Sequence, residues 1–239
     1  MKLCKLLLLT AAGFALLPGN ASATNGSAKD LRFQVLLDDE PIGSHSFRIT
    51  DESSKRTIES DASFDVRVLF VPVFNYRHNN TEIWRDGCLV KMEAQTDSNG
   101  KLYRVESRKE DSAYRIGTNT ATEAYPADCL MSFAYWDRQI LQQSRLLNAQ
   151  TGAVVDVDIE PLGETRLELG ERYVAADGYR IIAEDQDVDI KVWYSRADGS
   201  WLSLESRLKN GRLMRYLPAD PELLMASGVE DGVGLPEVR

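Results

Sequence analysis

The chain has 239 residues, of which 43% are hydrophobic and 27% charged, a balance typical of a globular protein that can bury a core. Its formal net charge of −9 opposes binding to phosphate backbones, so nucleic acid is not expected as a partner. Only two histidines are present, too few for a polyhistidine metal site, and the chain has none of the common catalytic motifs. We therefore predict no catalytic residue, metal site or cofactor.

The first 23 residues have the pattern of a secretory signal peptide. A basic segment at Met1–Lys5 precedes the apolar stretch Leu6–Leu17, and Ala21–Ala23 supplies the small residues that signal peptidase requires. At about 1.5 Å per residue the apolar stretch is too short for the roughly 30 Å hydrocarbon core of a bilayer. We expect cleavage before Thr24, export to the periplasm of a Gram-negative cell, and no integral membrane segment in the mature chain.

Strand signals dominate the chain from residue 31 to residue 217. They follow a flexible lead-in at 24–30 and precede a loose tail at 218–239. Apolar and polar side chains alternate in residues 31–37, 42–50, 155–160 and 188–194, as in strands with one buried face. Five turn dipeptides favour tight hairpins: Asp86-Gly87, Asn99-Gly100, Asp177-Gly178, Asp198-Gly199 and Asn210-Gly211.

One segment interrupts the strands. Between residues 125 and 148, apolar side chains recur at near-helical spacing, which predicts a short helix at about Phe133–Ser144. The predicted fold is all-β. A single domain of about nine to eleven antiparallel strands forms a strongly curved sheet or incomplete barrel, with the short helix near its opening.

The stretch Phe64–Trp84 contains the candidate ligand-binding residues. If the strand is regular, its even-numbered side chains share one face, where two aromatic rings, an imidazole and a carboxylate would form the polar end of a cavity. These residues are Tyr76, His78, Glu82 and Trp84, and the residues expected at the apolar end are Phe70, Val73, Phe133 and Trp136. Alternatively, the aromatic rings are core, and the carboxylate and imidazole pair with each other or with arginine.

The apolar run Val68–Phe74 within this stretch has two interpretations. It is either a strand buried on both faces or an exposed lip at the mouth of a barrel, and Pro72 favours an edge or a bend.

Two cysteines, Cys88 and Cys129, follow the predicted signal, in a compartment where disulfides persist. A bridge between them would close a loop of about 42 residues and contribute roughly 4 kcal/mol. Two unpaired, buried thiols are the alternative. The absence of C-x-x-C from the sequence argues against a thiol oxidoreductase.

The order of these features resembles an uncharacterised family of secreted proteobacterial domains of unknown function, over roughly Leu31–Leu217. The segments that carry the resemblance include Pro41-Ile42-Gly43, Tyr76-x-His78, Glu82-x-Trp84, Asp86-Gly87-x-Leu89 and Trp193-Tyr194. More distantly, the chain is similar to periplasmic half-barrels, namely the lipoprotein-localisation carriers and the isoprenoid-binding lipocalin-like proteins. This resemblance implies a periplasmic barrel or half-barrel with an apolar cavity. It implies no enzyme activity and transfers no active site.

The leading hypothesis is a soluble periplasmic binding or carrier protein for an apolar or amphipathic, lipid-like small molecule. A non-enzymatic envelope assembly or interaction protein, acting through exposed strand edges and the acidic tail, is the first alternative. An enzyme of envelope lipid metabolism is the second, and it would need Glu82 or His78 to have a strongly shifted pKa in an open cleft.

Overall fold

The computed structural model describes residues 27–68 and 71–220 of the chain. The predicted signal peptide at 1–23 and nearly all of the predicted tail lie outside the described residues. Residues 27–30, expected in a flexible lead-in, instead belong to the first strand, where Ser27 pairs with Asp51 of the second. No helix in the described part of the chain is long and apolar enough to cross a membrane.

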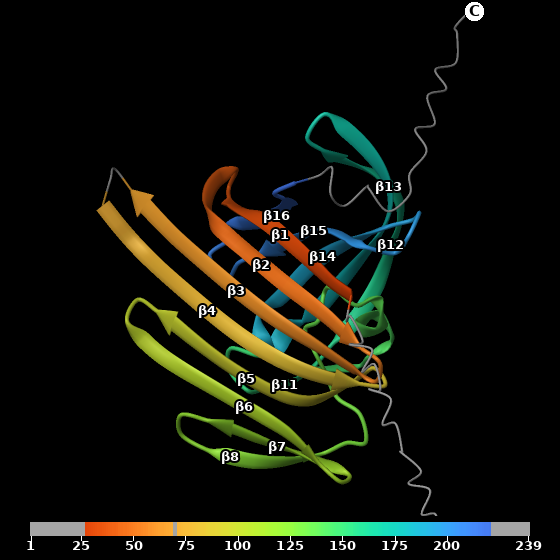
Figure 1. Cartoon of the computed structure of the whole chain (residues 1–239). Helices are drawn as coiled ribbons and strands as arrows, with labels where there is room; N and C mark the ends of the chain where they lie inside the picture. The colour runs from red at the N-terminus through yellow and green to blue at the C-terminus, as the bar shows by residue number, and fades with distance from the viewer. Residues whose placement is uncertain (1–26, 69–70, 221–239) are drawn as a thin grey trace, which may run out of the picture.

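Thirteen strands form one antiparallel sheet, in the order β12-β13-β14-β15-β16-β1-β2-β3-β4-β5-β6-β7-β8. The sheet is strongly curved (Figure 1), and it stays open because its edge strands β12 and β8 do not pair with each other. The strands are β1 (Ser27–Leu37), β2 (Glu40–Glu52), β3 (Lys55–Val68), β4 (Val71–Arg85), β5 (Cys88–Ser98), β6 (Lys101–Glu110), β7 (Ala113–Thr118), β8 (Thr122–Pro126), β12 (Asp158–Leu169), β13 (Arg172–Ala183), β14 (Val188–Ser195), β15 (Trp201–Arg207) and β16 (Leu213–Pro218).

Turn chemistry explains most of the hairpins. The β4–β5 turn has Asp86 at φ 50° and Gly87 at φ 75°, and the β5–β6 turn has Asn99 at 53° and Gly100 at 83°. Two successive residues with positive φ match the twist of a two-residue hairpin. The dipeptides at 198–199 and 210–211 also lie in turns, but the turn prediction at Asp177-Gly178 is wrong. That pair lies inside β13, where the missing side chain of Gly178 makes room for the Trp193 indole.

A second, three-stranded sheet has the order β11-β10-β9 and consists of β9 (Met131–Ser132), β10 (Arg145–Leu147) and β11 (Val154–Asp156). It belongs to the segment 127–157, which we call the inner segment. This segment packs on the concave face of the large sheet: Leu146 and Leu147 are fully buried, and the Trp136 ring meets Trp84 of β4 edge to face at 5.3 Å.

The prediction of about nine to eleven strands is wrong, because the described residues contain sixteen. Some of the strands are too short to show an alternating pattern from which they could be recognised. β9 has two residues and β10 has three.

The predicted helix at Phe133–Ser144 is also wrong in type and length. The described residues contain no α-helix; at this position lies the 3₁₀ helix η1 (Arg138–Gln142), capped by the Asp137 side chain. A second 3₁₀ turn, η2, spans Glu184–Gln186. The apolar residues of this segment pack on different neighbours, since Tyr135 contacts Trp201 of β15 and Trp136 contacts Trp84 of β4. η1 lies against the β4–β5 turn, where a Cβ at Gly87 would meet Gln139, and so covers one end of the concave face.

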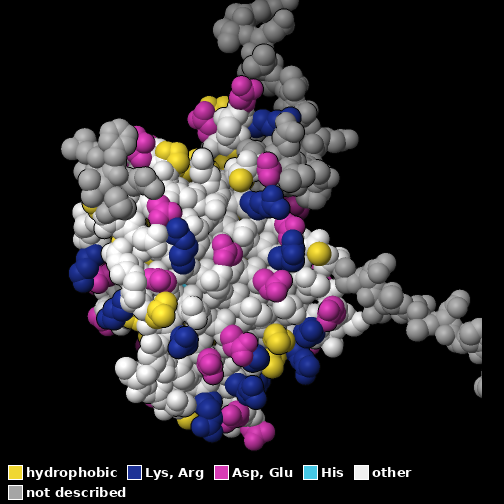
Figure 2. Space-filling view, turned by 60° about the vertical axis from the view of Figure 1, so that its left-hand side comes forward, with side chains coloured by type: hydrophobic (Ala, Val, Ile, Leu, Met, Phe, Trp, Pro, Cys, Tyr) yellow, Lys and Arg dark blue, Asp and Glu magenta, His cyan; other side chains and the backbone are white. Residues whose placement is uncertain are grey.

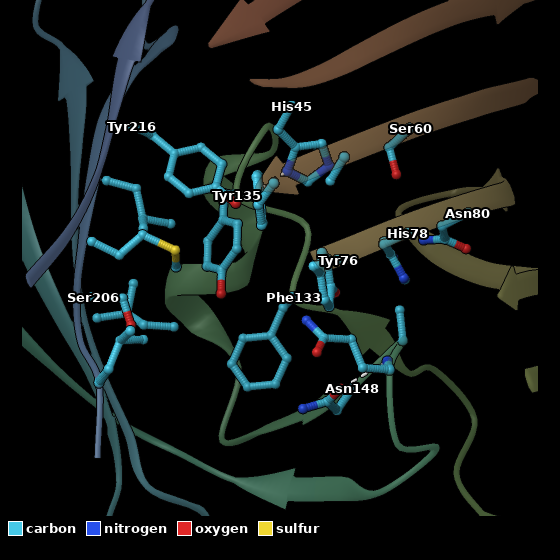
Figure 3. Close-up of a pocket in the computed structure, with 18 of the residues that line it drawn as sticks. His45, Ser60, Tyr76, His78, Asn80, Phe133, Tyr135, Asn148, Ser206 and Tyr216 are labelled. Atoms are coloured by element: carbon cyan, nitrogen blue, oxygen red, sulfur yellow. Dashed lines mark hydrogen bonds between the residues drawn. The ribbon is translucent and has the colours of Figure 1, made fainter. Parts of the chain in front are cut away.

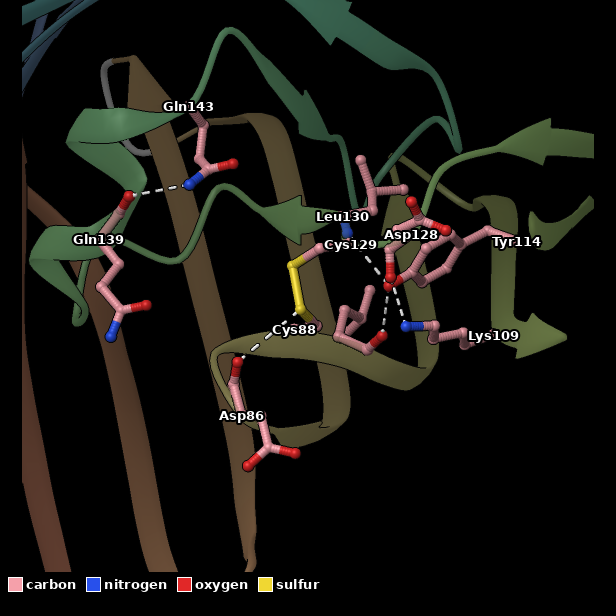
Figure 4. The surroundings of a disulfide bond; sticks show 10 residues. Asp86, Cys88, Lys109, Tyr114, Asp128, Cys129, Leu130, Gln139 and Gln143 are labelled. Atoms are coloured by element: carbon pink, nitrogen blue, oxygen red, sulfur yellow. Dashed lines mark hydrogen bonds between the residues drawn. A yellow bond between two sulfur atoms is a disulfide. The ribbon is translucent and has the colours of Figure 1, made fainter. Parts of the chain in front are cut away.

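A disulfide ties the inner segment to the large sheet (Figure 4). The Sγ atoms of Cys88 and Cys129 are 2.08 Å apart, and the Leu89 N–H donates to the Leu130 carbonyl at 3.0 Å. The Tyr114 hydroxyl, buried beside them, donates to the Leu89 carbonyl at 2.8 Å and accepts from the Leu130 N–H at 3.0 Å. The start of β5 and the start of the inner segment are thus fixed together covalently and by hydrogen bonds.

The outer surface is polar and of mixed charge. On the face seen in Figure 2, acidic and basic side chains are interspersed with scattered hydrophobic ones, instead of gathering into a patch of one sign. Exposed ion pairs such as Arg77–Asp65 at 2.9 Å and Arg115–Glu110 at 3.0 Å contribute little to stability. The apolar side chains are concentrated between the concave face and the inner segment, where the core lies.

Candidate functional site

A cavity of about 680 Å³ lies between the concave face of the sheet and the inner segment (Figure 3). This volume is in the range of roughly 300–1,000 Å³ found for small-molecule sites. Strands β2, β3 and β4 form one wall, and β14, β15 and β16 form the other. Residues Ser132–Trp136 of the inner segment cover one end of the cavity. The chain itself thus closes the cavity at that end.

The wall formed by β4 is built by simple strand alternation. Tyr76, His78, Asn80 and Glu82 all line the cavity because every second side chain of a strand points to the same face. Trp84, the next in the series, is only 2% exposed and does not line the cavity. It lies beneath the inner segment and contributes to the site through a hydrogen bond to Glu82.

The residues predicted at the apolar end are divided between the two ends of the cavity. Phe133 and Trp136 line it from the inner segment, and Trp136 contacts Trp84, so it lies at the same end as Glu82. Val73 also lines the cavity, but it is 52% exposed and lies toward the β3–β4 turn, so the apolar run is not buried on both faces there. Phe70 lies outside the described residues.

Glu82 is buried and held by neutral side-chain donors, namely Asn80, Ser132 and Trp84. The Trp84 indole N–H donates to Oε2 at 2.8 Å, and the Asn80 amide donates to Oε1 at 2.9 Å. Burial raises the pKa of Glu82, and these hydrogen bonds oppose the rise only in part. Among the described residues no ion pair reaches Glu82, so the predicted alternative of a Glu82–His78 or Glu82–arginine pair does not form.

The two histidines of the chain both line the cavity. The ring of His78 is hydrogen-bonded through Nδ1 to the buried Thr96 hydroxyl at 2.8 Å, and Nδ1 of His45 lies 3.3 Å from the Tyr216 hydroxyl. Desolvation lowers the pKa of His78 to about 4, against a smaller opposing effect of the Asp61 carboxylate. Desolvation, followed by the proximity of His78, lowers the pKa of His45 to about 3. Both rings are therefore neutral at pH 7.

Sequence reasoning missed several lining residues. His45 follows the same alternation as Phe47 and Ile49 in the predicted hairpin. The alternating pattern could therefore have placed the His45 side chain on the face that lines the cavity. Tyr135 and Tyr216 also point into the cavity (Figure 3), but they come from the inner segment and from β16. No local pattern could bring them beside β4, because their approach depends on how the sheet curves.

The charged groups of the mouth are paired. Arg212 lines the cavity and its Nε lies 2.6 Å from the Asp38 carboxylate of the β1–β2 turn, while Asp187 lies 2.7 Å from the Lys209 ammonium. In the part of the chain that the structure describes, no group of three or more His, Cys, Asp or Glu side chains could hold a metal ion. The interior of the cavity thus combines apolar surface with hydrogen-bonding side chains, which are the features of a small-molecule binding site.

Fold and site together define an open, strongly curved β-sheet protein with an internal cavity. The chain belongs to the family described as Domain of unknown function (DUF6134), whose model matches residues 33–219. The match runs from within β1 to just beyond β16 and so includes the whole cavity. It confirms the prediction of an uncharacterised domain family. No curated protein matches the sequence.

Proposed function

We propose that this protein binds and carries an apolar or amphipathic, lipid-like molecule in the cavity between the curved sheet and the inner segment. The observation that carries the proposal is the cavity itself, about 680 Å³ in a position where protein interiors are normally filled by side chains. An apolar occupant would remove its own surface and that of the lining from water, which favours binding.

The lining combines apolar and polar side chains, as an amphipathic ligand requires. The β14–β16 wall contributes the apolar side chains Ile190, Leu204 and Met214, and the facing wall contributes the polar groups of His78 and Asn80. A few placed polar groups in a mostly apolar site are what orient a ligand of this kind.

A periplasmic location belongs to the same proposal. The signal-like pattern of residues 1–23 supports export, and the Cys88–Cys129 disulfide is of a kind that persists in oxidising compartments. The open, curved sheet around a cavity is also the architecture implied by the sequence resemblance to periplasmic lipid-handling half-barrels.

An enzyme of lipid metabolism would use the same residues, but the geometry favours binding. Both carboxylate oxygens of Glu82 are engaged by Asn80 and Trp84, and the Nδ1 atom of His78 is engaged by Thr96. These contacts hold the two groups in place against the wall of the cavity.

Titration of the protein with a fluorescent fatty-alcohol probe tests the proposal. Ala62 is 2% exposed and lines the cavity, so an A62F variant fills the space, and we expect its affinity to fall by about 10-fold or more. A124F, on the exposed face of β8, adds the same ring outside the cavity and should leave the affinity unchanged. Far-ultraviolet circular dichroism checks that both variants fold. Absence of probe binding to the wild-type protein, or equal affinity in A62F, would contradict the proposal.

A further inference from the structure

We propose that the cavity selects ligands whose polar head carries no net charge and both donates and accepts hydrogen bonds, such as an alcohol or a primary amide at the end of an aliphatic chain. This inference rests on the proposed function and names the ligand class.

Four hydrogen-bonding side chains form a band across the wall of the cavity, which we call the polar band: His45, Ser60, His78 and Asn80. They come from the three adjacent strands β2, β3 and β4 and point into the same space (Figure 3). The register explains the cluster, because Ala62 pairs with both His45 and His78, and Ser60 pairs with Asn80. The small side chain of Ala62 leaves room between the two imidazoles.

The polar band has hydrogen-bonding capacity that the protein leaves unused. Among the described residues, His45 Nε2 and Asn80 Oδ1 are buried and have no hydrogen-bond partner. Buried polar atoms are normally satisfied, and an unpaired one costs stability. A ligand head or a water held by it can supply the missing partners, since the imidazole can donate or accept according to its tautomer and the amide oxygen accepts.

The charges around the cavity exclude an anionic head. Arg212 is the one arginine or lysine among the described residues that line the cavity, and it is engaged by Asp38 at the mouth. Both histidines are neutral at pH 7, so a phosphate or carboxylate at the polar band would be buried without a counter-charge. Burial of an unpaired charge is strongly unfavourable.

A cationic head is disfavoured for the complementary reason. Glu82 is 3% exposed, and its carboxyl group already accepts from Asn80, Trp84 and Ser132. The other acidic residue that lines the cavity, Asp187, is paired with Lys209 at the mouth. An ammonium group at the polar band could donate to Asn80 Oδ1 or His45 Nε2, but these acceptors are neutral, and burying a charge beside them without a free counter-charge is unfavourable.

The position of the polar band fixes the direction of the ligand. Along β4, Asn80 lies roughly 20 Å from Phe74 at the β3–β4 end, at about 3.3 Å per residue. Phe74, Tyr76 and Phe64 stack between these points, with Phe64 and Tyr76 at 5.2 Å between ring centroids. The head thus enters first and reaches the polar band, and the aliphatic chain extends along these rings toward the mouth.

The experiment compares four ligands of one chain length by isothermal titration calorimetry at pH 7.5: dodecanol, dodecanamide, dodecanoate and dodecylammonium. We expect dodecanol and dodecanamide to bind about 10-fold or more tightly than the two charged ligands. Equal or tighter binding of dodecanoate or dodecylammonium would overturn the inference and leave the proposed function intact. Failure of all four to bind would remove the proposed function itself.

A variant of the polar band tests whether these side chains recognise the head group of the ligand. H45F removes both ring nitrogens and should reduce the preference for dodecanol over dodecane by about 5-fold or more. S46A changes the neighbouring residue on the opposite face of β2 and serves as the control with an unchanged preference. If H45F does not fold, S60A removes the hydroxyl of the polar band with minimal disturbance. An unchanged preference in a folded H45F or S60A protein would overturn the assignment.

Discussion

The buried histidines make the stability of this protein sensitive to mild acid. An imidazole has a pKa of about 6.5 in an unfolded chain, whereas the folded protein holds the pKa of His78 at about 4 and that of His45 at about 3. As the pH falls below 6.5, the unfolded chain takes up protons that the folded protein cannot accept. The stability associated with neutral burial is therefore present above pH 6.5 and is lost progressively below it.

The magnitude follows from the two pKa values of each ring. Between pH 7.5 and pH 5, each histidine lowers the free energy of unfolding by about 2 kcal/mol, so the pair lowers it by about 4 kcal/mol. Glu82 acts in the opposite direction, because its raised pKa gives stability that is present at low pH and lost as the pH rises. The net change in the wild-type protein is thus smaller than the contribution of the histidines alone.

Urea denaturation of wild-type, H78Q and H45Q protein between pH 5 and pH 7.5 separates these contributions. Each substitution should reduce the loss of stability over this range by about 2 kcal/mol, because glutamine does not titrate. E82Q should do the reverse and steepen the loss on acidification. If the wild-type and H78Q profiles are parallel, the imidazole titrates normally in the folded protein, and the description of a buried polar band is wrong.

Three further changes test other parts of the structure. Replacing Cys88 and Cys129 together with serine should lower the free energy of unfolding by about 4 kcal/mol, as measured in urea, and a stability insensitive to reductant would contradict the bridge. G43A should lower the free energy of unfolding by roughly 3 kcal/mol, as measured by thermal or urea unfolding, because a Cβ at this position would overlap the Ser63 carbonyl oxygen of β3. A G43A protein as stable as the wild type would refute this close approach. W84F should cost about 1–3 kcal/mol, since it leaves Glu82 Oε2 without its donor, and the double variant W84F/E82L should recover part of that loss if the hydrogen bond is the cause.

The parts of the fold that could be predicted from the sequence are those fixed by local chemistry. Alternation placed Tyr76, His78 and Glu82 on one face of β4, because a strand repeats every two residues whatever surrounds it. The turn at Asp86-Gly87 was predictable for a similar reason, since its two positive φ angles need that residue pair.

The parts that could not be predicted depend on contacts distant in sequence. Asp177-Gly178 has the composition of a turn, yet β13 continues through it because Gly178 accommodates Trp193 of the neighbouring strand. The inner segment has helical spacing but folds as a 3₁₀ turn and short strands, because its apolar groups face different parts of the curved sheet. The wall opposite β4, with Tyr216, exists only once β16 has paired with β1.

The most direct test of a ligand-holding cavity is the measurement of intermolecular nuclear Overhauser effects between methyl-labelled protein and bound dodecanol. We expect contacts from the dodecanol chain to the methyl groups of Ile190, Leu204 and Met214, which line the cavity wall. The exposed Leu162 of β12 should show none. Contacts confined to outer residues such as Leu162, with none to the three cavity residues, would show that the sheet does not shelter a ligand in its interior.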